Sequence, residues 1–326
     1  MTLEPDRRRS PPPVVKSAAM RALFKQASRI ARTDEPVLLL GETGAGKGVL
    51  ARAIQASSLR ADRPMLDLNC AALPESLIES ELFGYEPGAF TGARGRKKGL
   101  LELVDGGTLL MDEVGELPLL LQSKFLQVLE SGRFLPVGGS QYLETDFRLI
   151  AATNRNIHKA KDEGSFRLDL YFRLSVFVLE LPPLRERMEE LPDLIRAFLE
   201  EVDSGLSIAP EALERLCCHR WPGNVRELRN VIRHAALLCE GKQIGISDLP
   251  PWLIESCPRQ DILNGGSWKD KVRCFESQLL ASELEKHGGD IDATTRKLGI
   301  SRSSLYRKIQ QHEAEEEGPP ADADLR

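Results

Sequence analysis

The sequence predicts an α/β fold in which helices flank a parallel sheet, with all-helical parts toward the C-terminus. Three observations support this prediction. Short, wholly apolar stretches typical of buried strands alternate with segments whose apolar residues recur at helical spacing. The first such stretch, 37–40, leads into a glycine-rich run at 41–48 and then into a helical pattern. Beyond Pro182-Pro183, which break the chain, helical patterns follow one another.

The composition is that of a soluble globular protein. The 326 residues suffice for two or three domains, and 29% of them are charged and 41% hydrophobic. No apolar run approaches the ~20 residues that span a bilayer. The arginine- and proline-rich N-terminus lacks the apolar core of a secretion signal. A cytoplasmic location without a membrane partner is therefore expected.

Charge and cysteine content argue against two further classes. A net charge of −5 speaks against a protein that coats nucleic acid generally, although it permits one small basic module. The six cysteines form no Cys-x-x-Cys pair and the five histidines are scattered, so no zinc site is expected. Cys217 and Cys218 fall in an apolar helical pattern and are predicted to be buried packing residues.

The run at 41–48 has the context of a phosphate-binding loop, because a strand precedes it and a helix over 49–57 follows. In that order, backbone N–H groups and the helix N-terminus can surround phosphate oxygens while Lys47 reaches the outer phosphates. Gly48 stands where the generic motif has the Ser or Thr that binds Mg²⁺. The residues assigned to the nucleotide are Gly41, Glu42, Thr43, Gly44, Ala45, Gly46, Lys47 and Gly48.

Polar residues follow three later strands. The predicted strand 65–68 is followed by Asn69, and the strand 107–111 by Asp112 and Glu113. The strand 147–152 is followed by Thr153 and Asn154. Helices are expected over 17–32, 77–83 and 118–131. Because ligands of parallel sheets bind at the carboxyl ends of the strands, these polar residues should meet there. Asp112 is assigned to the metal and Glu113 to activation of an attacking water.

The hexapeptide Gly88-Ala89-Phe90-Thr91-Gly92-Ala93 lies between the first two of these strands. Glycine permits backbone angles that other residues avoid, so we expect a mobile loop tip with one apolar point at Phe90. An ordinary glycine-rich surface turn would have the same local composition. Four basic residues follow, namely Arg94, Arg96, Lys97 and Lys98.

Arginines mark two further places. Arg167 and Arg173 lie near a predicted short helix. Arginine is the side chain best suited to stabilise a phosphoryl group during transfer. Surface salt bridges are the ordinary alternative for this pair. A helical bundle is expected over 188–238, with one helix starting at Pro222-Gly223-Asn224. Arg226 falls in the first turn of that helix, where arginine is unfavourable to the helix dipole, and this indicates an anionic partner.

A linker at 253–267 should lead to a small C-terminal helical domain. Helices are predicted over 268–287, 290–298 and 301–311. The stretch 296–308 holds five basic residues and no acid, which favours a helix-turn-helix that binds DNA. A basic helix on a plain helical hairpin fits the same pattern. The predicted DNA contacts are Arg302, Ser303, Ser304, Tyr306, Arg307 and Lys308.

Together these motifs resemble the sigma-54-dependent transcription activators, the bacterial enhancer-binding proteins of the AAA+ class. The resemblance extends from about residue 15 to residue 308. The sequence Gly-Ala-Phe-Thr-Gly-Ala at 88–93 is close to diagnostic for this family, whereas a phosphate loop alone would not be. The other stretches that carry the resemblance are 41–47, 69–73, 81–84, 181–187 and Trp-Pro-Gly-Asn-Val-Arg-Glu-Leu at 221–228.

The resemblance implies a domain plan, ligands and partners. The implied parts are a disordered tail at 1–13, an AAA+ α/β ATPase subdomain at 14–185, a helical lid at 186–252, a Fis-type helix-turn-helix at 268–313 and an acidic tail at 314–326. Such a protein binds ATP and Mg²⁺, forms a dimer on double-stranded DNA, and assembles into a hexameric ring when active. Its target is sigma-54 within the RNA polymerase holoenzyme.

The resemblance also implies a role for each candidate residue. Asn69 would restrain Glu113 according to nucleotide state, and Thr153 and Asn154 would lie at sensor I. Arg167 and Arg173 would be arginine fingers, and Arg226 would be sensor II. The hexapeptide 88–93 would face the pore of the ring and contact the sigma factor.

Three departures from the family pattern stand out. Gly48 replaces an acidic residue, which is expected to modify metal binding and turnover. Thr294 and Thr295 stand where small alanines are usual. A regulatory domain needs on the order of a hundred residues, and only a short tail precedes the ATPase part. This organisation resembles phage shock protein F and the Hrp-type activators, so control is expected from a trans-acting regulatory protein or from expression level.

The function implied is that of an ATP-dependent activator of sigma-54 RNA polymerase. One alternative is another AAA+ remodelling motor, which the hexapeptide and the C-terminal DNA reader oppose. The second is a DNA-binding regulator with weak or no ATPase activity. The presence of Lys47, Asp112 and Glu113 opposes that reading.

Overall fold

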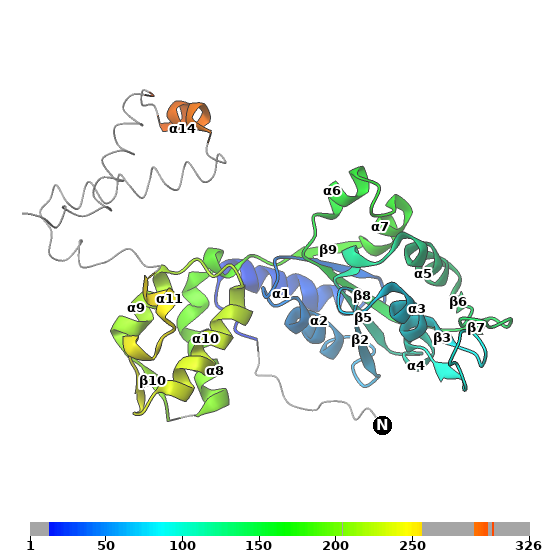
Figure 1. Cartoon of the computed structure of the whole chain (residues 1–326), viewed down its shortest axis with the longest axis horizontal. Coiled ribbons are helices and arrows are strands. Elements are labelled where there is room, and N and C mark those ends of the chain that lie inside the picture. The colour runs from blue at the N-terminus through cyan, green and yellow to red at the C-terminus, as the bar shows by residue number, and fades with distance from the viewer. Residues whose placement is uncertain (1–12, 204, 256–289, 299–301, 303–326) are drawn as a thin grey trace, which may run out of the picture. The chain divides into compact units, whose positions relative to one another are not determined.

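The computed structural model describes residues 13–203, 205–255, 290–298 and 302. The chain divides into two compact units, Met1–Ile254 and Glu255–Arg326. Figure 1 shows the first unit as a sheet with helices around it, followed by a separate group of helices that begins near residue 184. We call this second group the lid.

A five-stranded parallel sheet forms the centre of the first unit, with the strand order β2-β5-β8-β1-β9. All four strands predicted from the sequence are present, which confirms the α/β class. The bounds are β1 Val37–Leu40, β2 Met65–Asn69, β5 Thr108–Asp112, β8 Arg148–Thr153 and β9 Phe177–Glu180.

The sequence pattern does not predict β9. Leu179 is the one residue of this strand that is fully buried, and Val178 is exposed. The strand pairs along the outer side of β1, from Val37 opposite Phe177 to Leu40 opposite Glu180. The residues at 176–179 are all apolar, like those of β1, but a short apolar run does not show by itself whether it forms a strand or part of a helix.

Helices cover both faces of the sheet because neighbouring strand residues point in opposite directions. Leu38 belongs to one apolar core, which is shared with α3, α5 and α7, whereas Val37 and Leu39 belong to the other, shared with α1 and α2. Figure 1 shows the resulting layers. The helices are α1 Ala18–Ile30, α2 Lys47–Ala56, α3 Glu75–Phe83, α4 Leu100–Leu103, α5 Leu119–Ser131, α6 Ile157–Asp162 and α7 Leu168–Leu174, with the 3-10 turn η1 Val114–Glu116.

Two small antiparallel hairpins project from this layer. Strands β3 (Gly84–Tyr85) and β4 (Lys97–Lys98) carry the loop that contains the hexapeptide, and β6 (Arg133–Phe134) and β7 (Leu143–Glu144) carry a second loop. The two hairpins are joined where Glu86 N donates to Val137 O at 3.0 Å and Val137 N donates to Gly84 O at 2.9 Å. The second loop therefore lies against the base of the first.

The lid has its own apolar core around Trp221, which is fully buried and donates from its indole nitrogen to Leu216 O at 3.0 Å. A bundle of helices alone is predicted here, but β10 (Ser207–Ile208) and β11 (Gln243–Ile244) form a short parallel pair. The other elements are α8 Leu191–Val202, α9 Pro210–Cys218, α10 Asn224–Leu238, α11 Pro251–Glu255 and the 3-10 turns η2 Leu184–Glu186, η3 Met188–Glu190 and η4 Ile246–Asp248.

The linker predicted at 253–267 overlaps the end of the lid, because helix α11 runs through Glu255 and buries Leu253, and the rest of that stretch lies outside the described residues. One expectation about the lid is wrong. Cys217 and Cys218 are exposed, because α9 presents Ala212 and Leu216 to the core and the two cysteines lie off that stripe.

Cysteine exposure gives a chemical test of this packing. Burial raises the pKa of the Cys70 thiol to about 12, with a further contribution from the Asp112 carboxylate. Because only the thiolate attacks alkylating reagents, we expect iodoacetamide at mildly alkaline pH to modify Cys217 and Cys218 long before Cys70. Peptide mass spectrometry over time measures this order. Equal rates in the folded protein would contradict the burial of Cys70, and urea should remove the difference.

In the second unit the structure describes α14 (Ile291–Leu298), which coincides with the predicted helix at 290–298. Thr294 and Thr295 are both buried, and Thr294 Oγ1 donates to Asp290 O at 2.7 Å. Arg302 is exposed. The other predicted DNA contacts lie outside the described residues, and they are Ser303, Ser304, Tyr306, Arg307 and Lys308. Within the described ranges, no helix has both the length and the apolar character needed to cross a membrane.

Candidate active site

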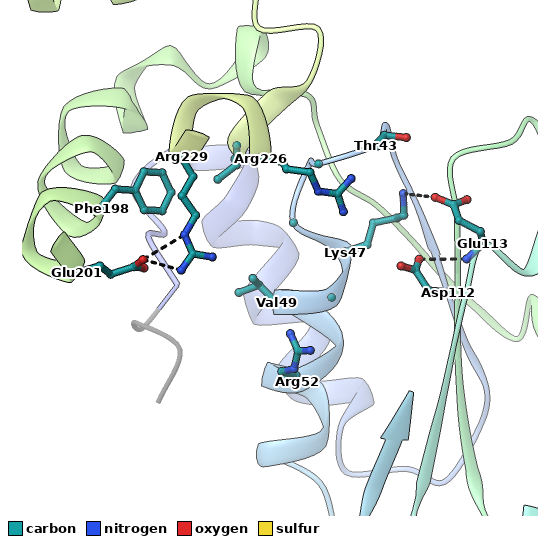
Figure 2. A pocket seen from close by; sticks show the side chains of 14 residues that line it. Thr43, Lys47, Val49, Arg52, Asp112, Glu113, Phe198, Glu201, Arg226 and Arg229 are labelled. Atoms are coloured by element: carbon teal, nitrogen blue, oxygen red, sulfur yellow. Dashed lines mark hydrogen bonds and ion pairs between the residues drawn. The ribbon is translucent and has the colours of Figure 1, made fainter. Parts of the chain in front are cut away.

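A cavity of about 320 Å³ lies between the carboxyl edge of the sheet and the lid. Figure 2 shows its side chains, which come from the phosphate loop and α2 on one wall, from the end of β5 on another, and from α8 and α10 of the lid opposite them. The lining residues are Thr43, Gly44, Gly46, Lys47, Gly48, Val49, Arg52, Asp112, Glu113, Phe198, Glu201, Val225, Arg226 and Arg229.

The glycine-rich run leaves the start of α2 open toward this cavity. Gly46 is the N-cap residue, with φ 110°, and no side chain caps the first turn of the helix. Gly44 has φ 77°, and a Cβ atom there would lie 2.3 Å from Gly223 O of the lid. Glycine is therefore required at position 44 both for the backbone angle and for the close approach of the lid. The exposed N–H groups of a helix start form an anion site.

Lys47 occupies the centre of the loop. Its side chain is buried, and Nζ donates to Gly41 O at 2.8 Å. The same nitrogen lies 3.7 Å from Glu113 Oε1. The loop thus holds an ammonium group between the glycine-rich backbone and the acids at the end of β5 (Figure 2).

The two acids and the residues after β8 meet at the sheet edge, as their positions after parallel strands predict. Glu113 has a left-handed backbone with φ 52°, which turns its carboxylate toward Lys47. Its Oε2 accepts a hydrogen bond from Asn154 N at 3.0 Å, and Asn154 Nδ2 donates to Thr43 Oγ1 at 2.8 Å. Asn154 therefore links the acid at the end of β5 to the phosphate loop. Thr153, beside it, is fully buried.

No hydrogen bond joins the side chains of Asn69 and Glu113 in the described part of the chain. Although Asn69 pairs with Asp112 in the sheet register, its side-chain oxygen accepts from Ala71 N at 2.9 Å. Within the part of the chain that the structure describes, the Glu113 carboxylate accepts a hydrogen bond from Asn154 N and forms an ion pair with Lys47. The sheet register places Asn69 at the carboxyl edge of the sheet, as predicted, but its side-chain oxygen accepts a hydrogen bond within the local turn.

The arginines divide into two groups. Arg226 lies in the first turn of α10 and points into the cavity, and it has no ion-pair partner among the described residues (Figure 2). Arg167 and Arg173, on α7, are exposed and do not line the cavity. Arg167 pairs with Asp169 at 2.7 Å, and Arg173 Nη2 donates to Leu129 O at 2.8 Å. The structure therefore does not bring these two arginines to the site of their own chain.

Several residues of the site carry no signal in the sequence. Arg229 of α10 pairs with Glu201 of α8 at 2.5 Å, and both line the cavity. Arg52 on α2 also lines it and pairs with Asp67 at 3.2 Å. Each pair forms within its own part of the chain, and Arg52, Arg229 and Glu201 come to one cavity only where the lid packs on the sheet. Their positions in the sequence therefore do not predict that they share a site.

A second, mainly apolar cavity of about 100 Å³ adjoins the phosphate loop. It lies beside the start of α2, between α1 and the lid helix α8. Buried Arg187 lines it, donates to Ala45 O and pairs with Glu190 at 3.2 Å. The apolar lining side chains include Val14, Met20, Phe24, Val49, Leu50, Leu194 and Phe198.

The hexapeptide forms a closed loop with an exposed tip. Gly88 N donates to Ala93 O at 2.9 Å, and Gly88 and Gly92 have φ values of 82° and 104° that favour glycine. Phe90 is 49% exposed, and one side of its ring packs edge-on against Tyr85 with centroids 4.9 Å apart. The tip therefore presents an aromatic side chain and Thr91 outward.

Gly48 offers a stability test that is independent of catalysis. It lies within α2 without a positive φ, and the nearest atom to an added Cβ would be Arg52 Nη1 at 3.7 Å. We expect Gly48→Ala to stabilise the protein by about 0.5–1 kcal/mol because alanine loses less backbone entropy in a helix. Urea unfolding measures this effect. Gly44→Ala is the matched control and should destabilise, and destabilisation by Gly48→Ala would show that position 48 is constrained in some other way.

The comparisons with known proteins agree with this geometry. The family profile described as the Sigma-54 interaction domain matches residues 14–180. The AAA+ ATPase lid domain matches 185–263, and the Fis family of bacterial regulatory proteins matches 271–312. The chain belongs to the sigma-54 activator family. It has the AAA+ fold with a lid, and its last match is to a Fis-type helix-turn-helix.

Relatives of this sigma-54 activator family member include regulatory protein AtoC of Escherichia coli, which is 43% identical over 91% of the chain. The transcriptional regulatory protein ZraR of Klebsiella oxytoca is 41% identical over 90% of it. The chain spans 66% of AtoC and 68% of ZraR. Among solved structures, NtrX from Brucella abortus in complex with ATP matches with a TM-score of 0.73 and 33% identity, over 92% of this chain and 69% of NtrX.

Proposed function

We propose that the protein hydrolyses ATP and uses the energy to activate sigma-54 RNA polymerase. One observation carries this proposal. The same α/β subdomain holds a site with the residues for phosphoanhydride hydrolysis and an exposed loop with an aromatic tip between Gly88 and Gly92. The site lies at the carboxyl edge of the sheet, and the loop rises from the β3–β4 hairpin. Family membership supports the coupling of the two.

The cavities fit a nucleotide in shape and charge. The uncapped start of α2 and Lys47 would bind the phosphates, since backbone N–H groups and an ammonium group attract anions. The apolar cavity beside Val49 would hold the base, because a purine ring has large apolar faces. A solved relative, NtrX, is described as a complex with ATP. ATP is therefore the substrate that we assign to the site.

Mg²⁺ would supply charge neutralisation on the outer phosphates when it is bound. Asp112 is the carboxylate that we assign to the hard cation, and position 48 offers no side-chain oxygen because it is glycine. Lys47 holds the phosphates by its positive charge. Glu113, restrained by Asn154 N, would orient the attacking water and take its proton. Arg226 would bind phosphate oxygens from the lid side.

Arg167 and Arg173 would serve the nucleotide of a neighbouring copy in a ring. They are exposed and lie outside their own cavity. Four large, exposed apolar side chains lie close to them along the chain, between the start of α7 and β9, and exposed apolar surface of this kind is typical of an interaction site. These side chains are Leu168, Phe172, Val176 and Val178, with exposures of 55%, 64%, 45% and 44%. A second copy of the chain is the occupant that would use the arginines.

Charging this patch gives the corresponding prediction. We expect Phe172→Asp to keep the protein folded but to prevent assembly, because a carboxylate would be buried at the contact. Light scattering with an ATP transition-state analogue measures the assembly, and ATP turnover should stop rising with protein concentration. Leu59→Asp, at a residue that is 78% exposed elsewhere, is the control. Normal assembly of Phe172→Asp would place the contact on another surface.

The hexapeptide loop and the C-terminal domain would contact the transcription machinery and the DNA. The tip at Phe90 and Thr91 would contact sigma-54 and move with the hydrolysis cycle. The Fis-type domain would bind double-stranded DNA upstream of the promoter as a dimer, through Arg302 and the predicted contacts that follow it. Phosphate contacts make such binding dependent on salt.

The test is ATP-dependent open-complex formation by the purified protein on a sigma-54 promoter. Thr91→Ala should abolish open complexes while ATP turnover continues. Ser140→Ala is the matched control, because it removes an exposed hydroxyl from the neighbouring 135–142 loop. Full activity of Thr91→Ala would remove the role given to the tip. DNA binding without any ATP turnover would instead support a non-hydrolysing regulator, and turnover without sigma-54 binding would support another motor.

A further inference from the structure

A polar contact joins the lid to the phosphate loop at Glu42, the second residue of the glycine-rich run. Arg185 donates to both carboxylate oxygens of Glu42, at 2.9 and 2.7 Å, and Asn224 Nδ2 donates to Glu42 Oε2 at 3.0 Å. We call these three residues the Glu42 clamp. Hydrogen bonds from Arg185 and Asn224 lower the pKa of the Glu42 carboxyl, so this group stays ionised at neutral pH.

Asn224 is the most constrained member of the clamp. It is fully buried at the start of α10 and has a left-handed backbone with φ 54°, a conformation that asparagine tolerates better than most residues. Its side-chain oxygen accepts from Leu184 N at 2.7 Å. Its side-chain nitrogen also donates to Thr43 O at 3.1 Å. A single amide thus joins the phosphate loop, the first turn of the lid at Leu184 and the first turn of α10.

This junction fixes the start of α10 at the cavity. The next residue, Val225, donates from its backbone N–H to Gly44 O at 3.1 Å. The residue after that is Arg226, whose side chain points into the cavity (Figure 2). Because Arg226 lies two positions beyond Asn224 on the same helical turn, a shift of the junction would displace the guanidinium group from the phosphate end of the cavity.

We propose that Asn224 is a positioning residue that holds Arg226 against the bound phosphates by locking the lid to the phosphate loop. This proposal rests on the proposed ATPase function. Asn224 does not line the cavity and acts through its neighbours. When the lid and the loop move apart, the amide releases Glu42 and Thr43 together, so the position of the lid and the shape of the loop are coupled.

Asn224→Asp is the most specific test, because aspartate has the same size as asparagine and also tolerates the left-handed backbone conformation. It replaces the donor that faces Glu42 by an oxygen, and two carboxylates would then meet at hydrogen-bond distance. Glu42→Gln in the same chain would supply a new donor and relieve the repulsion. Asn224→Gly keeps the positive φ without strain but removes the amide and the hydrogen bond to Leu184 N, so it tests the junction without adding a charge.

The experiment measures kcat and KM for ATP, together with the affinity for a fluorescent ATP analogue, in the full chain. Asn224→Asp and Asn224→Gly should each reduce kcat/KM about tenfold or more, and Asn224→Asp/Glu42→Gln should recover most of the loss. In an Arg226→Ala background, Asn224→Asp should cost less than about threefold, because the group that it positions is already absent.

Two results would overturn the proposal. One is an unchanged kcat/KM in both Asn224 variants, and the other is an equal loss with and without Arg226, which would indicate a structural role only. If the parent chain itself showed no turnover, the proposed ATPase function would fail. The same cycle of variants, read from the affinity for the fluorescent analogue, would still decide whether Asn224 positions Arg226.

Discussion

Glu113→Gln is expected to bind ATP as tightly as the parent protein and to lose about 100-fold or more in turnover, which is the range that a general base contributes. The reason lies in the geometry at the end of β5. The left-handed backbone at Glu113 and the hydrogen bond from Asn154 N aim the carboxylate at the phosphate loop. Glutamine keeps that hydrogen bond but cannot accept the proton of an attacking water.

Phosphate release gives the turnover of this variant, and a fluorescent ATP analogue gives its affinity. Glu116→Gln is the matched control, because Glu116 lies in the same turn, pairs with Arg155 at 2.5 Å and does not line the cavity. This control should retain normal turnover. Residual hydrolysis by Glu113→Gln near the parent rate would assign the base to another group, and joint loss of binding and turnover would point to a distorted loop.

The central fold was predictable because its signals are local. Strands β1, β5 and β8 are buried on both faces, so continuous apolar runs identify them in the sequence. The edge strand β9 was not predicted although 176–179 form an apolar run, because such a run alone does not tell a strand from a helix. The pair β10–β11 was not predicted because strands of two residues carry little pattern. Cys217 and Cys218 show the same limit, since a helix can place apolar residues outside its buried stripe.

The site was predictable only where one short stretch holds the chemistry. Asp112 and Glu113 stand at the end of β5, and Lys47 begins α2 after the loop that follows β1, so the parallel topology brings the three to one edge. The Glu42 clamp joins residues more than 140 positions apart, so no spacing in the sequence reports it. Asn69 shows the converse, because its place in the sheet register follows from the strand pattern, whereas its role toward Glu113 stays a prediction.

Arg173→Ala is expected to abolish turnover alone and to regain it when mixed with Glu113→Gln. Arg173 is exposed on α7 and does not line the cavity of its own chain, so in the proposed ring its charge would serve a neighbour. An arginine finger contributes about 10³-fold or more in other phosphate-hydrolysing enzymes. Each variant alone should therefore have less than about one hundredth of the parent turnover.

In a mixed ring, an Arg173→Ala subunit keeps Glu113, and a Glu113→Gln neighbour can donate the missing arginine. Random mixing of equal amounts completes about a quarter of the contacts in a head-to-tail ring. Turnover of the mixture should therefore rise well above that of either variant, and it should fall again when the mixture is diluted. Arg133→Ala, at an exposed arginine paired with Glu144, should remain active without mixing. If the mixture stayed inactive, Arg173 would have to act within its own chain, which would require α7 to move across the face of the sheet.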